Sequence, residues 1–340
     1  MRAAPLFWGK PPGLIADLLL PASAVWNAAG RVRRALSHPY RAAVPVVCVG
    51  NLVTGGAGKT PVTLALSTWL LERSIAVHVV MRGYGGRLRG PVRVDPAHHD
   101  ASAVGDEALL HAVRAVCWVA CDRAAGVRAA AEAGARVILL DDGLQNPAVA
   151  KALSIIVIDV AYGFGNRRVI PAGPLREGLG NGLARADSVM LLATEGELGR
   201  CEPFPISVGR PTISAVLSPV AGERLRGARL LAFAGIGRPQ KFFATVRALG
   251  VNLVGTRQFP DHHPFRVAEI DALRRDAERA GARLVTTAKD IVRLPPALRP
   301  GIEVLEVEIR WSDPEALDRL MMSVLRPADG DRSKPPDHTG

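Results

Sequence analysis

The sequence predicts an α/β protein with a mostly parallel sheet and helices on both faces. Apolar runs of strand length alternate with helical patterns through most of the chain, which is typical of repeated βα units. A glycine-rich loop joins the first well-defined strand to a helix, an arrangement common where a parallel sheet binds an anion. The 340 residues are also enough for two domains, each with its own core.

The first expected strand covers residues 44–49, and the helix after the glycine-rich loop runs to about Glu72. Strand, glycine-rich loop, Lys-Thr and helix follow in the order of a P-loop, so we predict a P-loop NTPase-like domain. Lys59 would reach the β- and γ-phosphates of a nucleotide, and the Thr60 hydroxyl would bind Mg²⁺. The usual pattern has glycine where this chain has Val53, and an ordinary glycine-rich turn is the alternative interpretation. The residues expected to bind the nucleotide here are Thr54, Gly55, Gly56, Ala57, Gly58, Lys59, Thr60 and Pro61.

The net charge of +11 predicts an anionic partner, such as a nucleic acid, an anionic membrane or a phosphorylated substrate. Aromatic residues make up only 5% of the chain, and the sequence lacks the basic-aromatic pattern of RNA-binding proteins. We therefore expect no nucleic-acid partner.

Residues 1–43 are predicted to form an amphipathic segment, not a signal peptide or a membrane-spanning helix. Asp17 and Pro21 interrupt the apolar stretch 13–30, which ends in a cluster of arginines. Trp26 beside those arginines suits a helix that lies in an anionic membrane surface. An amphipathic helix packed on the protein core is an equally good interpretation of this segment alone.

Arginines follow the ends of several later strands. Arg82 and Arg87 follow the second strand, Arg123 follows the third, and Arg176 lies in an irregular loop rich in proline and glycine. Ligands bind at the carboxyl edge of a parallel sheet, so these arginines could contact phosphate, although Arg82 and Arg87 could equally belong to a solvated turn. The expected strands are 76–81, 116–120, 136–140, 153–160, 188–193 and 213–217, and the expected helices are 106–113 and 123–133.

Two pairs of adjacent acids stand out. Asp141 and Asp142 close an apolar strand, as in a Walker-B-type site, where a carboxylate opposite the P-loop binds Mg²⁺ or its water shell. An ordinary turn can have the same sequence, but the P-loop upstream favours the functional interpretation. Asp106 and Glu107 begin a helix, where acids are favourable to the helix dipole without any further role.

A boundary near residues 221–229 separates the P-loop domain, 44–222, from a smaller α/β domain, 223–325. Within the smaller domain, His262 and His263 interrupt the βα pattern. Adjacent histidines rarely bind one metal ion together, so His262 is either an acid-base group beside a carboxylate or part of a capped loop. The polar, proline-containing stretch 326–340 is predicted to be a disordered tail. The expected elements are strands 230–234, 251–256, 283–287 and 302–309, and helices 239–249, 267–280 and 314–325.

Seven motifs occur in a fixed order between about Phe7 and Leu325. They are Gly50-Asn51-Leu52 with Gly55-Gly56-Ala57-Gly58-Lys59-Thr60-Pro61, Arg82-Gly83-Tyr84, Val104-Gly105-Asp106-Glu107, Asp141-Asp142-Gly143-Leu144-Gln145, Pro171-Ala172-Gly173-Pro174-Leu175-Arg176-Glu177, Phe259-Pro260-Asp261-His262-His263 and Thr287-Ala288-Lys289-Asp290. Each motif is weak alone, but together they closely resemble the tetraacyldisaccharide 4'-kinase family, the lipid A kinases of Gram-negative envelope synthesis. The family usually has His after its Asp-Asp-Gly-x-Gln stretch, where this chain has Asn146.

The resemblance implies ATP-dependent phosphorylation of the 4'-hydroxyl of an acylated glucosamine disaccharide 1-phosphate. It also implies Mg²⁺ as a cofactor and a place at the cytoplasmic face of the inner membrane, to which residues 1–43 would bind as a monotopic segment. A membrane-attached P-loop ATPase that acts as a switch for a partner is the alternative. Because Lys59 and His262 fall in different domains, the two domains are expected to close over ATP.

The resemblance also implies roles for particular residues. The family assigns acceptance of the hydroxyl proton to the aspartate of Gly-Asp-Glu, here Asp106, assisted by the histidine of Asp-His, here His262. Lys59 would hold the ATP phosphates, and Arg123 and Arg176 would neutralise charge on the transferring phosphoryl group. The expected Mg²⁺ ligands are Thr60, Glu107, Asp141 and Asp142.

Overall fold

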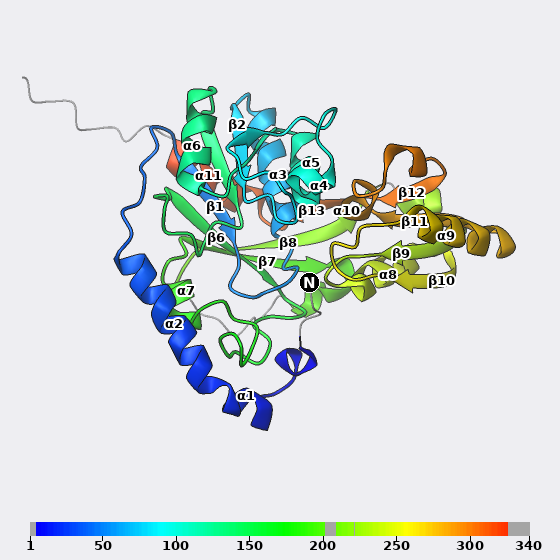
Figure 1. Cartoon of the computed structure of the whole chain (residues 1–340), viewed down its shortest axis with the longest axis horizontal. Coiled ribbons are helices and arrows are strands. Elements are labelled where there is room, and N and C mark those ends of the chain that lie inside the picture. The colour runs from blue at the N-terminus through cyan, green and yellow to red at the C-terminus, as the bar shows by residue number, and fades with distance from the viewer. Residues whose placement is uncertain (1–4, 201–208, 221, 326–340) are drawn as a thin grey trace, which may run out of the picture.

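The computed structural model describes residues 5–200, 209–220 and 222–325. Two α/β units lie side by side, and a long N-terminal helix runs along the edge of the larger one (Figure 1). The larger unit contains a nine-stranded sheet and the smaller unit a four-stranded sheet. This mixed α/β architecture with a large, mostly parallel sheet confirms the fold class that the sequence predicts.

Each strand expected before residue 222 is present, with boundaries shifted by at most two residues. The larger sheet contains β1 (Val46–Gly50), β2 (Val77–Met81), β3 (Val92–Arg93), β4 (Val116–Val119), β5 (Val137–Asp141), β6 (Leu153–Asp159), β7 (Ser188–Thr194), β8 (Thr212–Pro219) and β13 (Val307–Trp311). The smaller sheet contains β9 (Arg229–Ala234), β10 (Asn252–Gln258), β11 (Arg283–Thr287) and β12 (Ile302–Leu305). The α-helices are α1 (Leu14–Leu18), α2 (Leu20–Ala35), α3 (Lys59–Glu72), α4 (Ala101–Val104), α5 (Asp106–Ala112), α6 (Arg123–Glu132), α7 (Leu179–Leu183), α8 (Pro239–Ala248), α9 (Val267–Arg279), α10 (Ala288–Ile291) and α11 (Pro314–Leu325), and short 3-10 helices cover Leu6–Gly9, Glu195–Arg200, Gly222–Leu225 and Pro296–Leu298.

The larger sheet has the strand order β13-β8-β7-β6-β1-β5-β2-β4-β3, with antiparallel pairing only at the two edge strands. Every residue of β1, β2 and β5 is buried, because apolar cores cover both faces of the sheet. Burial on both faces explains why these strands are continuous apolar runs in the sequence. Since β1, β5 and β6 are parallel neighbours, the residues at their carboxyl ends meet at one edge of the sheet.

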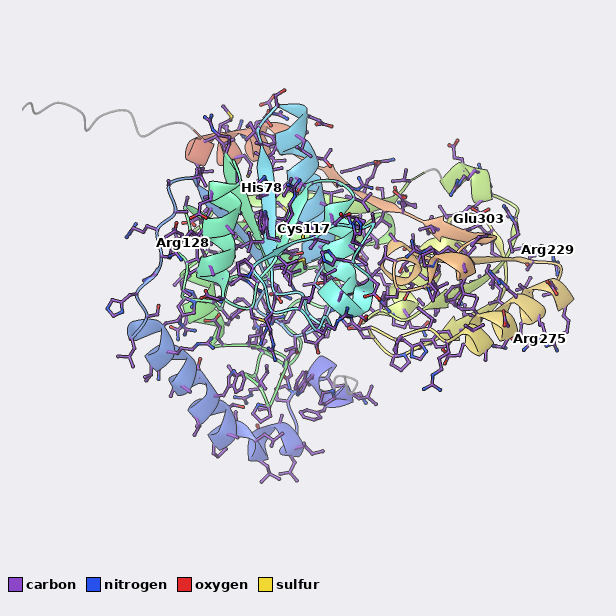
Figure 2. The ribbon with its side chains drawn as sticks, turned by 45° about the horizontal axis from the view of Figure 1, so that its top comes forward. His78, Cys117, Arg128, Arg229, Arg275 and Glu303 are labelled. Atoms are coloured by element: carbon purple, nitrogen blue, oxygen red, sulfur yellow. The ribbon has the colours of Figure 1, made fainter. Side chains whose placement is uncertain are left out.

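The smaller unit is a parallel sheet in the order β10-β9-β11-β12, and Arg229, Arg275 and Glu303 mark its position in Figure 2. The span 302–309 was expected to be one strand, but it is divided between two sheets. β12 pairs with β11 in the smaller sheet, and β13 pairs with β8 in the larger one. The strand pattern on either side of Glu306 is the same, so it gives no sign of the change of sheet.

The chain therefore returns to the larger unit before it ends. Helix α11 packs there through Leu317 and Met321, both fully buried in the same core as α3. The last strand and helix of the expected domain 223–325 thus belong to the larger unit. Two passes of the chain, the one after β8 and the one between β12 and β13, connect the units.

The N-terminal helices contact the larger unit mainly through polar groups. Ser23 Oγ donates to the Val169 carbonyl at 2.7 Å, and Trp26 Nε1 donates to the Arg176 carbonyl at 2.9 Å. Only Ala16 and Ser23 are buried in α1 and α2. Most large apolar residues of this segment are exposed; they are Leu6, Leu14, Ile15, Leu18, Val25, Trp26, Val32 and Leu36. Among the described helices, none combines the length and apolar character that crossing a bilayer requires. The expected disordered tail, 326–340, lies outside the described residues.

Candidate active site

A cavity of about 1530 Å³ lies where the two units meet. The larger unit contributes the residues of the P-loop and the carboxyl ends of β5 and β6, and the smaller unit contributes His262 and Lys289. The expected nucleotide-binding residues from Thr54 to Pro61 all line this cavity. The topology thus brings both halves of the predicted site together.

Two glycines turn the backbone of the P-loop. Gly55 and Gly58 adopt positive φ values of 101° and 82°, which turn the backbone toward the start of α3. Val53, which stands where the usual pattern has glycine, is buried and pairs with Leu175 in an isolated β-bridge. Val53 therefore differs from the usual glycine at a position where the P-loop pairs with the segment that contains Leu175.

Lys59 lies at the first position of α3 with its ammonium group near two oxygen acceptors. Its Nζ donates to Asn51 Oδ1 at 3.2 Å and lies 3.7 Å from Asp142 Oδ1. Arg176 Nη1 donates to the same Asp142 oxygen at 2.8 Å. Burial raises the pKa of Asp142, but Lys59 and Arg176 outweigh it and hold this pKa below its ordinary value. Asp142, expected as a Mg²⁺ ligand, and Arg176, expected to face phosphate, thus pair with each other beside the P-loop lysine.

Asp141 is the last residue of β5 and is buried. Its Oδ2 lies 2.9 Å from Nε2 of His111, a fully buried residue of α5. Its Oδ1 is also buried and has no hydrogen-bond partner among the described residues. A buried carboxyl oxygen without a hydrogen-bond partner is costly, so Asp141 fits a site that a cation or its water shell completes.

Asp106 and His262 come from different units and meet at the cavity. His262 Nδ1 lies 2.9 Å from Asp106 Oδ2, and Arg293 Nε donates to the same oxygen at 2.7 Å. Burial raises the pKa of Asp106, but the hydrogen bond from His262 and the charges of Lys289 and Arg293 lower it to about 2. Because an ionised carboxylate only accepts hydrogen bonds, Nδ1 of His262 is the donor in this contact.

Glu107 is bound by Lys289 of the smaller unit. Lys289 Nζ donates to Glu107 Oε1 at 2.9 Å and lies 3.4 Å from His262 Nε2. Burial lowers the pKa of Lys289, but the carboxylates of Glu107, Asp106 and Asp261 outweigh it and raise this pKa above its ordinary value. The start of α5 is therefore held by three basic side chains of the smaller unit, His262, Lys289 and Arg293.

The family model described as "Tetraacyldisaccharide-1-P 4'-kinase" matches residues 15–326. The chain belongs to this family. It is 53% identical over 329 residues to the tetraacyldisaccharide 4'-kinase of Rhodospirillum centenum, covering 95% of this chain and 96% of that one. It is 48% identical over 328 residues to the Rhodospirillum rubrum protein of the same name, covering 95% and 99%.

A solved structure of the family has the same fold. The crystal structure of LpxK from Aquifex aeolicus in complex with ATP superposes with a TM-score of 0.75 at 26% identity. The match covers 92% of this chain and all of that one. The fold of the tetraacyldisaccharide 4'-kinase family therefore extends over nearly the whole chain, both units included.

The remaining residues that the sequence singled out in this member of the 4'-kinase family lie partly in the cavity and partly outside it. Arg82 and Arg123 line the cavity, and Arg123 Nη1 donates to the Ala120 carbonyl. Arg87 instead bonds Ser102 on an exposed surface. His263 bonds Glu269 at 2.9 Å at the start of α9, so it belongs to a capped helix start. Asn146, where the family usually has His, accepts from the Ala148 backbone within a turn.

Sequence analysis assigned no role to Arg293, Lys289 or His111. Lys289 and Arg293 are four residues apart after β11, and this spacing places both on the side of the smaller unit that faces α5. The spacing could have indicated that the two side chains lie on one face. Nothing in the sequence indicated that β11 ends opposite α5. His111 follows Ala108, Leu109 and Leu110 on α5, where a core histidine is the simplest expectation.

Replacement of Arg293 by methionine should lower the free energy of unfolding by about 3–5 kcal/mol, because a buried ion pair loses one partner. The Arg293 side chain is 5% exposed and bonds Asp106, the Gly235 carbonyl and Asp290. Without it, two buried carboxylates lose their shared cation. Urea unfolding followed by circular dichroism measures the effect, and Arg293→Lys should recover part of it. A methionine variant as stable as the natural protein would contradict this account of the interface.

Proposed function

We propose that the protein transfers the γ-phosphate of ATP to the 4'-hydroxyl of tetraacyldisaccharide 1-phosphate, the lipid A precursor, and forms the 1,4'-bisphosphate. Family membership supports the reaction, and one contact supports its location. That contact joins Asp106 to His262 at 2.9 Å across the two units, in the cavity that the P-loop also lines. It brings a proton acceptor to the place where phosphate would bind.

ATP would bind with its phosphates on the P-loop. The backbone N–H groups of the loop and the N-terminus of α3 favour phosphate oxygens. Lys59 would exchange its contacts with Asn51 and Asp142 for the β- and γ-phosphates. Arg176 and Arg123 line the same cavity and would neutralise negative charge on the transferring group.

The residues near the P-loop fit a magnesium ion. Magnesium prefers hard oxygen ligands, which the Thr60 hydroxyl and the carboxylates of Asp141, Asp142 and Glu107 would supply; among the described residues these carboxylates do not already form a metal-binding group of three. The unpaired Oδ1 of Asp141 is the observation in favour of this site. When bound, the ion would neutralise charge on the phosphates.

Asp106 and His262 act as a pair in this proposal. His262 lines the cavity, whereas Asp106 lies behind it with both oxygens already accepting hydrogen bonds. The carboxylate would orient the ring and stabilise its protonated form, and Nε2 would take the proton of the sugar hydroxyl as it attacks phosphorus. Lys289 Nζ lies 3.4 Å from Nε2, where it would help hold the ring in place.

We also propose that the N-terminal segment binds the cytoplasmic face of the inner membrane. The outward apolar residues of α1 and α2 and the arginines at the end of α2 support this proposal. Trp26 links this segment to the loop of Arg176, so a lipid held at the membrane would lie close to the phosphate site.

Binding to anionic phospholipid vesicles should weaken at least tenfold when Leu14, Ile15 and Leu18 are changed together to serine. Each loses an exposed apolar group that would enter the lipid, at roughly 0.8 kcal/mol for each buried CH₂. Sedimentation with vesicles measures the bound fraction. Val267→Ser, an exposed apolar residue of the smaller unit, is the matched control and should bind normally. Equal vesicle binding by the triple variant and the natural protein would refute a membrane role for these helices.

Formation of ADP with and without the lipid acceptor tests the kinase proposal. We expect ADP to form at an appreciable rate only when tetraacyldisaccharide 1-phosphate is present in the detergent micelles. Lipid-independent ADP formation at the full rate would instead indicate a membrane-attached ATPase that switches a partner.

A further inference from the structure

We infer that the smaller unit contributes two phosphate-binding residues, Arg238 and Lys241, which Asp159 holds in the structure described here. The inference rests on the proposed use of ATP and adds two residues of the smaller unit to the ATP-binding site. It concerns residues outside the P-loop, the two acid pairs and the Asp106–His262 contact.

Asp159 is the last residue of β6 and is buried, with 5% of its surface exposed. Its Oδ2 accepts from Arg238 Nη1 at 2.9 Å and from Lys241 Nζ at 3.0 Å. Its Oδ1 accepts from the Ala161 backbone. Both basic residues come from the smaller unit, so this carboxylate is a contact between the units at the edge of the sheet where ligands bind.

Arg238 and Lys241 lie close to the P-loop. β6 is the neighbour of β1, whose carboxyl end leads into the P-loop, and Asp159, Arg238 and Lys241 line the same cavity as that loop. A Cβ added at Gly237, next to Arg238, would lie only 3.6 Å from the backbone nitrogen of Gly56. The start of α8 therefore faces the loop on which phosphates would bind.

The contacts repeat the pattern found at the P-loop lysine. Lys59 is held by Asp142 at the end of β5, and Arg238 and Lys241 are held by Asp159 at the end of β6. Arginine has five N–H donors and lysine has three, so one bond to Asp159 leaves each residue with further donors. Glu197 lies 3.4 Å from Lys241, and the Arg238 guanidinium stacks on Tyr162 at 4.2 Å, which fixes its plane.

Basic side chains held by a carboxylate beside an anion site can turn their remaining donors to phosphate oxygens, which accept charge-assisted hydrogen bonds. Closure of the two units over ATP would then be driven by contacts that only a polyphosphate provides. Adenosine, which has the base and ribose but no phosphate, would not make them.

Isothermal titration calorimetry with ATP and with adenosine tests this inference. Arg238→Gln and Lys241→Gln should each weaken ATP binding about tenfold, the loss of one charged contact, and leave adenosine binding unchanged. Arg247→Gln removes an exposed arginine from the far end of the same helix and should bind ATP normally. Asp159→Asn keeps the acceptor for Ala161 but releases the two basic residues, so ATP should bind several-fold more tightly.

The outcomes separate this inference from the proposed function. Failure of the natural protein to bind ATP would overturn the use of ATP itself. Normal ATP binding by the Arg238→Gln, Lys241→Gln double variant would overturn only the inference. The inference would also be overturned if the variants lost affinity for ATP and adenosine equally, or if a folded Asp159→Asn protein bound ATP more weakly. Either result would mean that Asp159, Arg238 and Lys241 only hold the two units together. If Asp159→Asn does not fold, the double variant alone decides.

Discussion

Replacement of Lys59 by alanine should reduce lipid phosphorylation by roughly 10³-fold, the scale found when a group that stabilises transition-state charge is removed. Lys59 is the one P-loop side chain placed to neutralise the β- and γ-phosphates, and its present partners, Asn51 and Asp142, show that its ammonium group points into the site. The initial rate of γ-phosphate transfer measures the effect.

Lys59→Arg provides the matched comparison. It keeps the charge, but the planar guanidinium does not fit the position of a compact ammonium group, so most of the activity should still be lost. Normal activity in Lys59→Ala would show that the glycine-rich loop is only a turn between β1 and α3, and the proposed mechanism would fall with it.

Replacement of Asp106 by asparagine should lower kcat by roughly 10²–10⁴-fold, the range for loss of general acid-base catalysis. The carboxylate accepts from His262 Nδ1, so Nε2 is the ring nitrogen that would take the proton. An asparagine amide can instead donate to Nδ1 and reverse the tautomer of the ring. Steady-state kinetics over a range of ATP concentrations measures the effect, and the KM for ATP should change little because Asp106 does not line the cavity. A proportional rise in KM with unchanged kcat would contradict a role in proton transfer.

The lowered pKa of Asp106 predicts that the stability of the fold depends on pH. The pKa of Asp106 is about 2 in the folded protein, below its ordinary value of 3.8. A lowered pKa stabilises the fold above the ordinary value, and this stabilisation is lost as the pH falls from about 4 toward 2. Urea unfolding between pH 3 and 7 should therefore show a steeper acid loss for the natural protein than for Asp106→Asn. Parallel curves would mean that Asp106 is not held ionised in the fold.

The sequence predicted the larger sheet and the P-loop well because both depend on local patterns. β1 and β5 are buried on both faces and so are continuous apolar runs, and the Gly-Lys-Thr ending of the loop requires the helix that follows. The position of Asp142 beside Lys59 also followed from the pattern, because parallel strands end at the same edge of a sheet.

The features of the fold and the site that the sequence did not predict depend on contacts between distant parts of the chain. Residues 302–309 have one strand pattern but belong to two sheets, since the partner of each half is decided by tertiary packing. Arg293 and Asp106 are 187 residues apart, and no local pattern indicates that they meet. His262 could be chosen over His263 only through the family motif, whereas the structure separates them by their partners, Asp106 and Glu269.

The most direct test of the account is transfer of labelled γ-phosphate from ATP to tetraacyldisaccharide 1-phosphate in detergent micelles. The matched control is the same lipid with phosphate already on its 4' position, which offers no hydroxyl there. We predict a labelled lipid product from the first acceptor and none from the second. ATP consumption without label in the lipid, or equal labelling of both acceptors, would contradict a 4'-kinase.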